Sequence, residues 1–272
     1  MQGQSRPRSN LDHDRYLRTQ DQLMRLKSHL PEDRVEVLAQ EVISRLADRR
    51  AHDPIDHPSH DQVEHLCHAL LSTDDSDGLR YIEEARAAGA SLEAAYLRYL
   101  TAAARMLGQR WDEDLVSFAE VSLGTNRMYA IMRALRSCAD NRPLARAGAP
   151  AAIFASVPGE THTLGVRMAA DLFANDGWSI DLKLGQTHEE LLSDIAASSR
   201  LVVGLSVAGL HSIHALSRLV VALRIARPEL KIFVGGYATD FARHAIELLD
   251  VDAMASDIKP AKLFLRKLWA SL

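Results

Sequence analysis

The fold is decided by residues 151–165, which read AAIFASVPGETHTLG. Residues 151–157 form an apolar run short enough for a buried parallel strand, and residues 166–175 have the apolar spacing of a helix. His162 therefore lies in a strand-to-helix loop. In an open α/β sheet such loops gather at the carboxyl ends of the strands, where ligands bind. This stretch thus predicts both a parallel sheet and the position of its binding site.

The residue types in this loop indicate a particular chemistry. A histidine can present one ring nitrogen to a metal while a neighbouring acceptor holds the other, and Glu160 is a candidate acceptor two residues before His162. Taken alone, the pattern Glu-x-His-x-x-Gly ending at Gly165 is a weak signal. The alternative is a loop histidine that bonds to backbone beside a glycine that opens a helix.

The remainder of the C-terminal half repeats the strand-helix alternation. Strand-like runs lie at 151–157, 178–184, 200–206, 230–234 and 251–254, and helical patterns lie at 163–176, 187–198, 212–226, 239–249 and 259–270. Thr187 and Glu190 form a capping box that supports the second of these helices. Five such units predict a doubly wound, parallel five-stranded sheet with helices on both faces.

The N-terminal half has helical periodicity throughout. We expect a polar leader to about residue 30, an amphipathic helix from Pro31, and then four helices separated by short connections, which is typical of a four-helix bundle. Ser59 with Gln62 would cap the first bundle helix, Gly89 would end the second, Ser91 would cap the third, and Asp112 or its neighbours would open the fourth. The apolar positions expected to line the bundle are Val63, Leu66, Cys67, Leu70 and Leu71; Leu79, Ile82 and Ala85; Leu92, Ala95, Tyr99 and Met106; and Leu115, Phe118, Val121 or Ser122, Thr125, Tyr129 and Met132.

These patterns divide the chain into four parts. The division predicted is a leader and amphipathic helix at 1–57, the bundle at 58–140, a linker rich in proline and arginine at 141–150, and the α/β domain at 151–272. The amphipathic helix before the bundle either packs on the bundle or is offered to a partner protein.

Composition narrows the class of protein. The chain has 47% apolar and 25% charged residues and a net charge of -4, which argues against attraction of the whole chain to nucleic acid. No apolar run approaches the ~18 residues of a membrane span, so we expect a cytoplasmic protein without membrane contact. Cys67 and Cys138 fall in helical patterns and are expected to be reduced and mostly buried. The histidines at 65 and 68 are expected to be solvated rather than zinc ligands.

Two further loops follow the third and fourth predicted strands. The first runs from Ser206 to Gly209, and the second begins with Gly235 and Gly236. Because the first, third and fourth strands of a doubly wound sheet are neighbours, these loops and the His162 loop are expected to surround one crevice. The glycines would leave backbone bare for a flat group, and Ser206 and Ser256 could form hydrogen bonds there. The simpler interpretation is a turn at Gly235 and Gly236 and a helix cap at Ser206.

In these motifs the chain resembles the cobalamin-binding domain family, whose pattern is Asp/Glu-x-His-x-x-Gly, then Ser-x-Leu, then Gly-Gly. The resemblance implies a Rossmann-like domain with a corrin on the carboxyl edge of its sheet and the nucleotide tail in its core. It implies that His162 is the lower axial ligand of cobalt, that Glu160 orients it, and that Ser206 contacts the nucleotide base. Gly235 and Gly236 would border the tail channel. One departure is Ala208, where leucine is common.

The bundle is similar to the helical cap of the same family, especially in the PpaA/AerR-type antirepressors of photosynthesis genes. The similar stretch is residues 107–127, which read LGQRWDEDLVSFAEVSLGTNR. Trp111 would stack over the corrin, although ordinary bundle core is the simpler role for it. Light-sensing relatives carry Glu-His where this chain has Val121 and Ser122, so an upper histidine ligand is missing at that position.

These features are consistent with three functions. The favoured one is a cobalamin-binding transcriptional regulator, an antirepressor-type sensor that acts through a repressor partner and is not itself an enzyme. The second is a corrinoid carrier for methyltransferases, and the third is a regulator that binds DNA directly. The sequence leaves open whether hydroxocobalamin, methylcobalamin or adenosylcobalamin is bound, what the signal is, and the oligomeric state.

Overall fold

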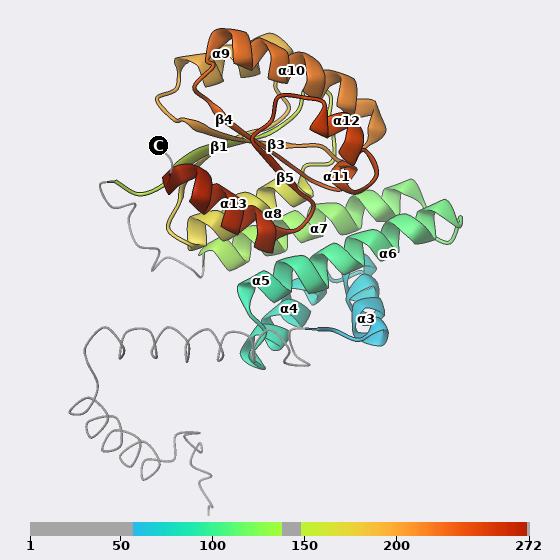
Figure 1. Cartoon of the computed structure of the whole chain (residues 1–272). Helices are drawn as coiled ribbons and strands as arrows, with labels where there is room; N and C mark the ends of the chain where they lie inside the picture. The colour runs from blue at the N-terminus through green and yellow to red at the C-terminus, as the bar shows by residue number, and fades with distance from the viewer. Residues whose placement is uncertain (1–56, 138–147, 271–272) are drawn as a thin grey trace, which may run out of the picture. The chain divides into compact units, whose positions relative to one another are not determined.

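A computed structural model describes residues 57–137 and 148–270 (Figure 1). The leader, the helix predicted from Pro31, most of the predicted linker and Cys138 lie outside the described residues. No described helix combines the length and the apolar character needed to cross a bilayer.

The C-terminal part is built on an all-parallel sheet, as the alternating pattern predicts. Its strands, in the order β2-β1-β3-β4-β5, are β1 (Ala151–Ser156), β2 (Ser179–Lys183), β3 (Val202–Ser206), β4 (Lys231–Gly235) and β5 (Ala253–Ala255). Residues Ser156, Ser206 and Gly235 pair in register across β1, β3 and β4. Three of the predicted loops therefore leave the sheet side by side, and the doubly wound fold is confirmed.

Helices cover both faces of this sheet (Figure 1). Helices α9 (His188–Ala197) and α10 (Ile213–Ala226) pack together on one face of the sheet. Helices α8 (Leu164–Asn175) and α13 (Ile258–Ala270) contact the opposite face. The capping box of Thr187 and Glu190 is present at the start of α9. The single helix predicted at 239–249 is instead two short ones, α11 (Ala238–Phe241) and α12 (Arg243–Glu247), because Ala242 leaves helical geometry with φ −108° and ψ 19°.

The two faces of the sheet differ in what they bury. Side chains alternate along a strand, so Ile153 and Val203 join the closed apolar core beneath α9 and α10, where both are fully buried. On the opposite face, Phe154 and Gly204 are paired on neighbouring strands. The glycine leaves room there, because a Cβ at Gly204 would lie 2.9 Å from the ring of Phe154. The α8 and α13 face is therefore the one that can hold a ligand.

The N-terminal part is the predicted bundle. Its helices are α3 (His60–Leu71), α4 (Asp77–Ala87), a continuous helix made of α5 (Leu92–Ala94), the π-helical segment η2 (Ala95–Leu100) and α6 (Thr101–Asp112), and α7 (Phe118–Ser137). Ser59 forms the predicted capping box with Gln62, and Ser91 caps α5 through the amide of Ala94. Cys67 is reduced and buried, and burial raises the pKa of its thiol to about 11.

The start of the fourth bundle helix differs from the prediction. The cap is Ser117, whose backbone amide and hydroxyl bond to Glu120, rather than Asp112 or its neighbours. Leu115 and Phe118, expected in the bundle core, are 67% and 70% exposed. The reason is that the chain reverses direction here, with Asp114 at φ 57°, and carries both side chains past the end of the bundle. The core of α7 is formed by Met128, Ile131, Met132 and Leu135.

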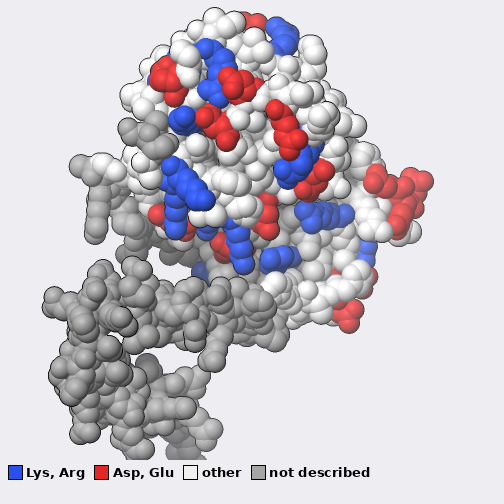
Figure 2. All heavy atoms as spheres, viewed as in Figure 1, with Lys and Arg blue, Asp and Glu red and all other residues white. Residues whose placement is uncertain are grey.

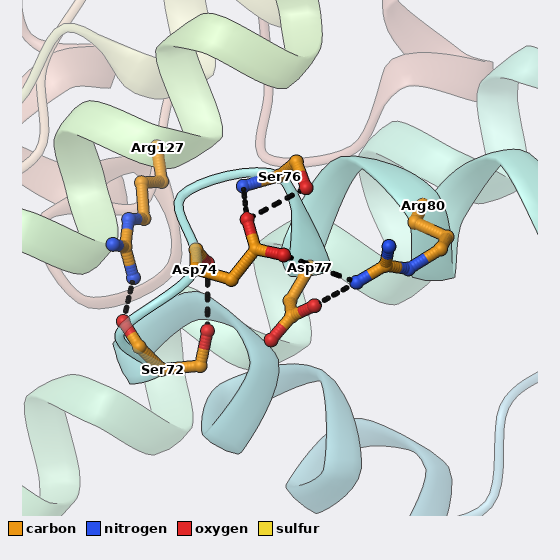
Figure 3. A network of polar contacts seen from close by, with 6 residues as sticks. All are labelled: Ser72, Asp74, Ser76, Asp77, Arg80 and Arg127. Atoms are coloured by element: carbon orange, nitrogen blue, oxygen red, sulfur yellow. Dashed lines mark hydrogen bonds and ion pairs between the residues drawn. The ribbon is translucent and has the colours of Figure 1, made fainter.

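The connection between α3 and α4 is held by a polar network (Figure 3). Asp74 accepts hydrogen bonds from the amide and hydroxyl of Ser76, and Arg80 pairs with Asp74 and Asp77. From α7, Arg127 donates to the backbone carbonyls of Leu70 and Ser72, at 2.9 and 2.7 Å. Side chains thus satisfy the carbonyl groups that end α3, and α7 is tied to the first helix pair.

Candidate functional site: a cavity at the carboxyl edge of the sheet

The loops that follow β1, β3, β4 and β5 surround one cavity of about 860 Å³. This volume is within the range of sites that enclose a small molecule or cofactor. Seven of the residues predicted from sequence line it, and the structure brings them together from loops up to 94 residues apart (256 − 162). They are His162, Gly165, Ser206, Gly209, Gly235, Gly236 and Ser256.

His162 lies at the cavity with its ring exposed and one nitrogen fixed. Its side chain is 71% exposed, while the Nδ1 atom lies 2.8 Å from Oε1 of Glu160. The same oxygen accepts the backbone amide of His162 at 2.9 Å. With Nδ1 held by a carboxylate, Nε2 is the nitrogen left to coordinate a metal, and the carboxylate raises its basicity.

Glu160 lies behind the histidine and does not line the cavity; its side chain is fully buried. Its other oxygen, Oε2, accepts the amide of Ala208 at 3.0 Å and the hydroxyl of Ser212 at 2.8 Å. Burial by itself raises the pKa of a carboxyl group, but the hydrogen bonds from His162, Ala208 and Ser212 outweigh it and lower the pKa of Glu160 to about 2. Glu160 is therefore a carboxylate at neutral pH, fixed by the loop that follows β3.

Two glycines of the motif are required for different reasons. Gly236 has φ +111°, and a Cβ there would collide with the carbonyl of Val207, so only glycine fits. At Gly165 the backbone is ordinary helix, and a Cβ would meet nothing within 4 Å. Since neither strain nor packing in the chain demands glycine at 165, the space that it leaves belongs to the cavity.

The cavity extends inward between the sheet and the helices α8 and α13. Phe154, Gly204 and Phe233 form its floor on the sheet, and Phe173, Ala261 and Leu265 form its walls on the helices. The edge-to-face pair of Phe154 and Phe173, with centroids 5.2 Å apart, stiffens this end. The inner part is thus an apolar channel, with Gly204 and Ala261 among the residues that line it.

The bundle forms the opposite wall. One face of the long helix lines the cavity through Leu97, Thr101, Arg105, Gly108, Gln109 and Asp112. Trp111, predicted to cover a corrin, does not line it in this structure; it is 47% exposed, and its ring lies against Phe118 with centroids 6.2 Å apart. Stacking of Trp111 over a corrin therefore stays a prediction.

Sequence reasoning missed several residues of this site. The sequence pattern places Ser212 only at the start of a helix, but in the structure its hydroxyl donates a hydrogen bond to the buried Glu160. Gly204 was hidden inside an apolar strand pattern, where the only signal was a glycine at an inward position. His211 has Nε2 3.9 Å from Oε2 of Glu160 and does not line the cavity.

Fold and site together define a class of protein: a helical bundle joined to a doubly wound domain that presents a carboxylate-held histidine at the mouth of a cavity. The B12 binding domain model matches residues 150–256, and a second B12 binding domain model matches residues 62–136. The chain belongs to the cobalamin-binding domain family, and cobalamin is its cofactor.

Two known proteins are similar over most of their length. An uncharacterized 20.5 kDa protein in the bchF-crtJ intergenic region of Rhodobacter capsulatus is 25% identical over 178 residues, which cover 65% of this chain and 92% of that protein. The monomethylamine corrinoid protein of Methanosarcina barkeri has the same fold, with a TM-score of 0.61 at 17% identity over 76% of this chain and 96% of that one. The relation to the PpaA/AerR type, inferred from the bundle motif, is confirmed.

The residues present fit a cobalamin. The exposed Nε2 of His162 suits cobalt, a metal that imidazole ligates. The bare helix start at Gly165 and the glycine pair at 235 and 236 leave room for a broad ring, and the channel behind them suits an apolar or aromatic tail.

Proposed function

We propose that this protein is a cobalamin-responsive transcriptional regulator, a sensor that acts through a repressor protein in the manner of an antirepressor. We propose further that His162 is the lower axial ligand of cobalt and that Glu160 holds it in orientation. Ser206 and Ser256 bind polar groups of the cofactor, Gly209, Gly235 and Gly236 border it, and Trp111 approaches its upper face.

One observation carries the proposal: a single cavity is walled by the sheet loops on one side and by α6 on the other. A ligand in it contacts both parts of the chain at once. Its binding free energy therefore depends on how the two parts are arranged, and by linkage the ligand shifts the population of that arrangement. A partner that recognises one arrangement then responds to cobalamin.

Within this proposal the chain's own residues have separate tasks. Glu160 stays ionised, because its pKa is about 2, and so keeps Nδ1 of His162 as the donor and Nε2 as the free lone pair. The apolar channel excludes water from the buried part of the cofactor. Bound cobalamin supplies a cobalt centre whose ligands respond to light, redox state or added groups.

The test is a mobility-shift assay on a photosynthesis-gene repressor bound to its operator DNA. We expect the protein loaded with hydroxocobalamin to change the amount of repressor–DNA complex, and the H162A variant or unloaded protein to have less effect. Equal effects of all three preparations, or none from any, would rule out a cobalamin-dependent regulator.

The second candidate is a corrinoid carrier in a methyltransferase system. The fold of the Methanosarcina barkeri corrinoid protein favours it, since the bundle and α/β domain align along 96% of that chain. Transfer of a methyl group from this protein, loaded with methylcobalamin, to a thiol acceptor in the presence of a methyltransferase would support this function over the first.

Direct DNA binding has less support. On the face shown in Figure 2, Lys and Arg side chains lie among Asp and Glu. Several basic residues are ion-paired: Arg224 with Asp252 at 2.7 Å, and Lys262 with Glu93 at 2.8 Å. Paired cations release fewer counterions from phosphates, so they contribute less to DNA affinity.

A further inference from the structure

A hydroxyl from the bundle reaches the loop that carries His162. Tyr129, on α7, lies with its Oη atom 2.9 Å from Oγ1 of Thr163, the residue directly after His162. Thr163 is also the N-cap of α8, yet its hydroxyl makes no capping hydrogen bond with the helix. A threonine at an N-cap normally accepts an amide of the first turn. Here the hydroxyl bonds to the bundle instead.

The ring of Tyr129 is itself held by the same helix. The guanidinium of Arg167, one turn into α8, lies 5.3 Å from the centre of the Tyr129 ring. A cation over an aromatic face is attracted to it, and more strongly where water is excluded. Nε of Arg167 is buried without a hydrogen-bond partner, so at this atom no hydrogen bond competes with the contact to the ring. Tyr129 is thus clamped between the first turn of α8 and the loop before it.

A second contact joins the two parts farther along α8. The buried carboxylate of Asp171 accepts hydrogen bonds from Tyr96 at 3.2 Å and from Arg136 at 3.0 Å. This contact holds the bundle against α8 but lies eight residues beyond Thr163. Packing of the bundle on the α/β domain therefore does not depend on Tyr129 alone. The Tyr129 contact differs from the Asp171 contact because it reaches the loop that carries His162.

We propose that Tyr129 is a positioning residue: through Thr163 it couples the bundle to the loop that presents His162, so that ligation of cobalt and the arrangement of the bundle depend on each other. This inference rests on the proposed function of the His162 site, and it identifies the contact through which ligation at that site would affect the bundle. Loss of the Tyr129 hydroxyl frees the loop from α7, which weakens ligation by His162 and leaves the bundle less responsive to it.

The test uses the full chain loaded with hydroxocobalamin and, separately, with methylcobalamin, whose strong upper ligand weakens the bond on the opposite side of cobalt. The absorption spectrum reports the ratio of His162-ligated to unligated cobalt. We expect Y129F and T163V each to lower this ratio by about two- to tenfold, the effect of one lost hydrogen bond. The double variant should do no more than either single one, because both remove the same bond.

Two matched variants control for loss of a hydroxyl elsewhere. Tyr81 donates to a carbonyl within the bundle at 2.9 Å, and Tyr96 contacts Asp171 across the same two parts. Y81F and Y96F should leave the spectra unchanged. An additive double variant, or equal spectral changes in Y129F and Y96F, would overturn the proposal.

A second readout needs no corrin. Hydrogen exchange of the amides at 160–165 should be about two- to tenfold faster in Y129F than in Y96F. If the unaltered protein retains no cobalamin, the proposed function fails, while this comparison still decides whether Tyr129 holds the loop. Equal exchange in both variants would contradict the coupling.

Discussion

The buried carboxylate of Glu160 should contribute strongly to stability even in protein without cobalamin. Its pKa is lowered from 4.5 to about 2, a difference that corresponds to about 3 kcal/mol at neutral pH. Because the folded-state pKa is the lower one, this stability is fully present above about pH 4.5 and is lost as the pH falls toward 2. We expect the free energy of unfolding of E160Q at pH 7 to be about 3 kcal/mol lower than that of the unaltered protein. The glutamine amide has a single acceptor oxygen, so it cannot accept hydrogen bonds from Ala208 and Ser212 on one side and from His162 on the other.

The assay is urea unfolding of both proteins at pH 7 and at pH 3. From the two pKa values, the difference in unfolding free energy between the unaltered protein and E160Q should shrink to about 1.4 kcal/mol at pH 3, where the carboxyl is almost fully protonated in the unfolded chain and still mostly ionised in the folded one. A difference that stays constant between these pH values would show that E160Q acts through packing rather than through the charge. No difference at pH 7 would refute the hydrogen-bond network as described.

Three further changes separate the roles of other residues. G236A should destabilise the fold by at least about 2 kcal/mol in urea unfolding, because φ +111° and the Val207 carbonyl both exclude a Cβ; unchanged stability would refute that reasoning. G165L should change the free energy of unfolding by less than about 1 kcal/mol but abolish retention of hydroxocobalamin on gel filtration, because the leucine side chain enters the cavity and a Cβ at this position meets no other atom of the chain; undiminished retention would show that the corrin binds elsewhere. D171A should lower the free energy of unfolding by about 2–3 kcal/mol, because it leaves Tyr96 and Arg136 without their shared acceptor; a decrease below about 0.5 kcal/mol would show that this contact contributes little to stability.

Much of the fold follows from local pattern. Short continuous apolar runs predict every described strand, and apolar spacing with a period of 3.6 predicts nearly every helix of the α/β domain, because a parallel strand covered by helices on both faces buries most of its residues. The division of 239–249 into two helices was not foreseen, since the break at Ala242 comes from backbone geometry that no glycine or proline announces. The prediction starts the fourth bundle helix near Asp112, whereas the structure has a turn at 113–117, because Leu115 and Phe118 are apolar like core residues but lie exposed.

The site was predictable where the residue types are chemically unusual. His162, Glu160 and the glycine pair stand out in sequence because few structural roles need them in strand-end loops. Ser212, Gly204 and Tyr129 do not stand out, because each acquires its role only from a contact across 52, 50 and 34 residues of chain (212 − 160, 204 − 154 and 163 − 129). Spacing along the sequence carries no information about such partners.

The most direct test of the account is the absorption spectrum of the purified protein and of H162A after mixing with hydroxocobalamin and removing the unbound cofactor. H162A removes one of the four hydrogen bonds to the buried Glu160 carboxylate and leaves the other three, so the free energy of unfolding should fall by about 1–2 kcal/mol and the protein should stay folded. The account predicts a retained corrin with a histidine-ligated spectrum in the unaltered protein, and loss of that spectrum in H162A with the fold intact. The same spectrum and affinity in both proteins would contradict ligation of cobalt by His162.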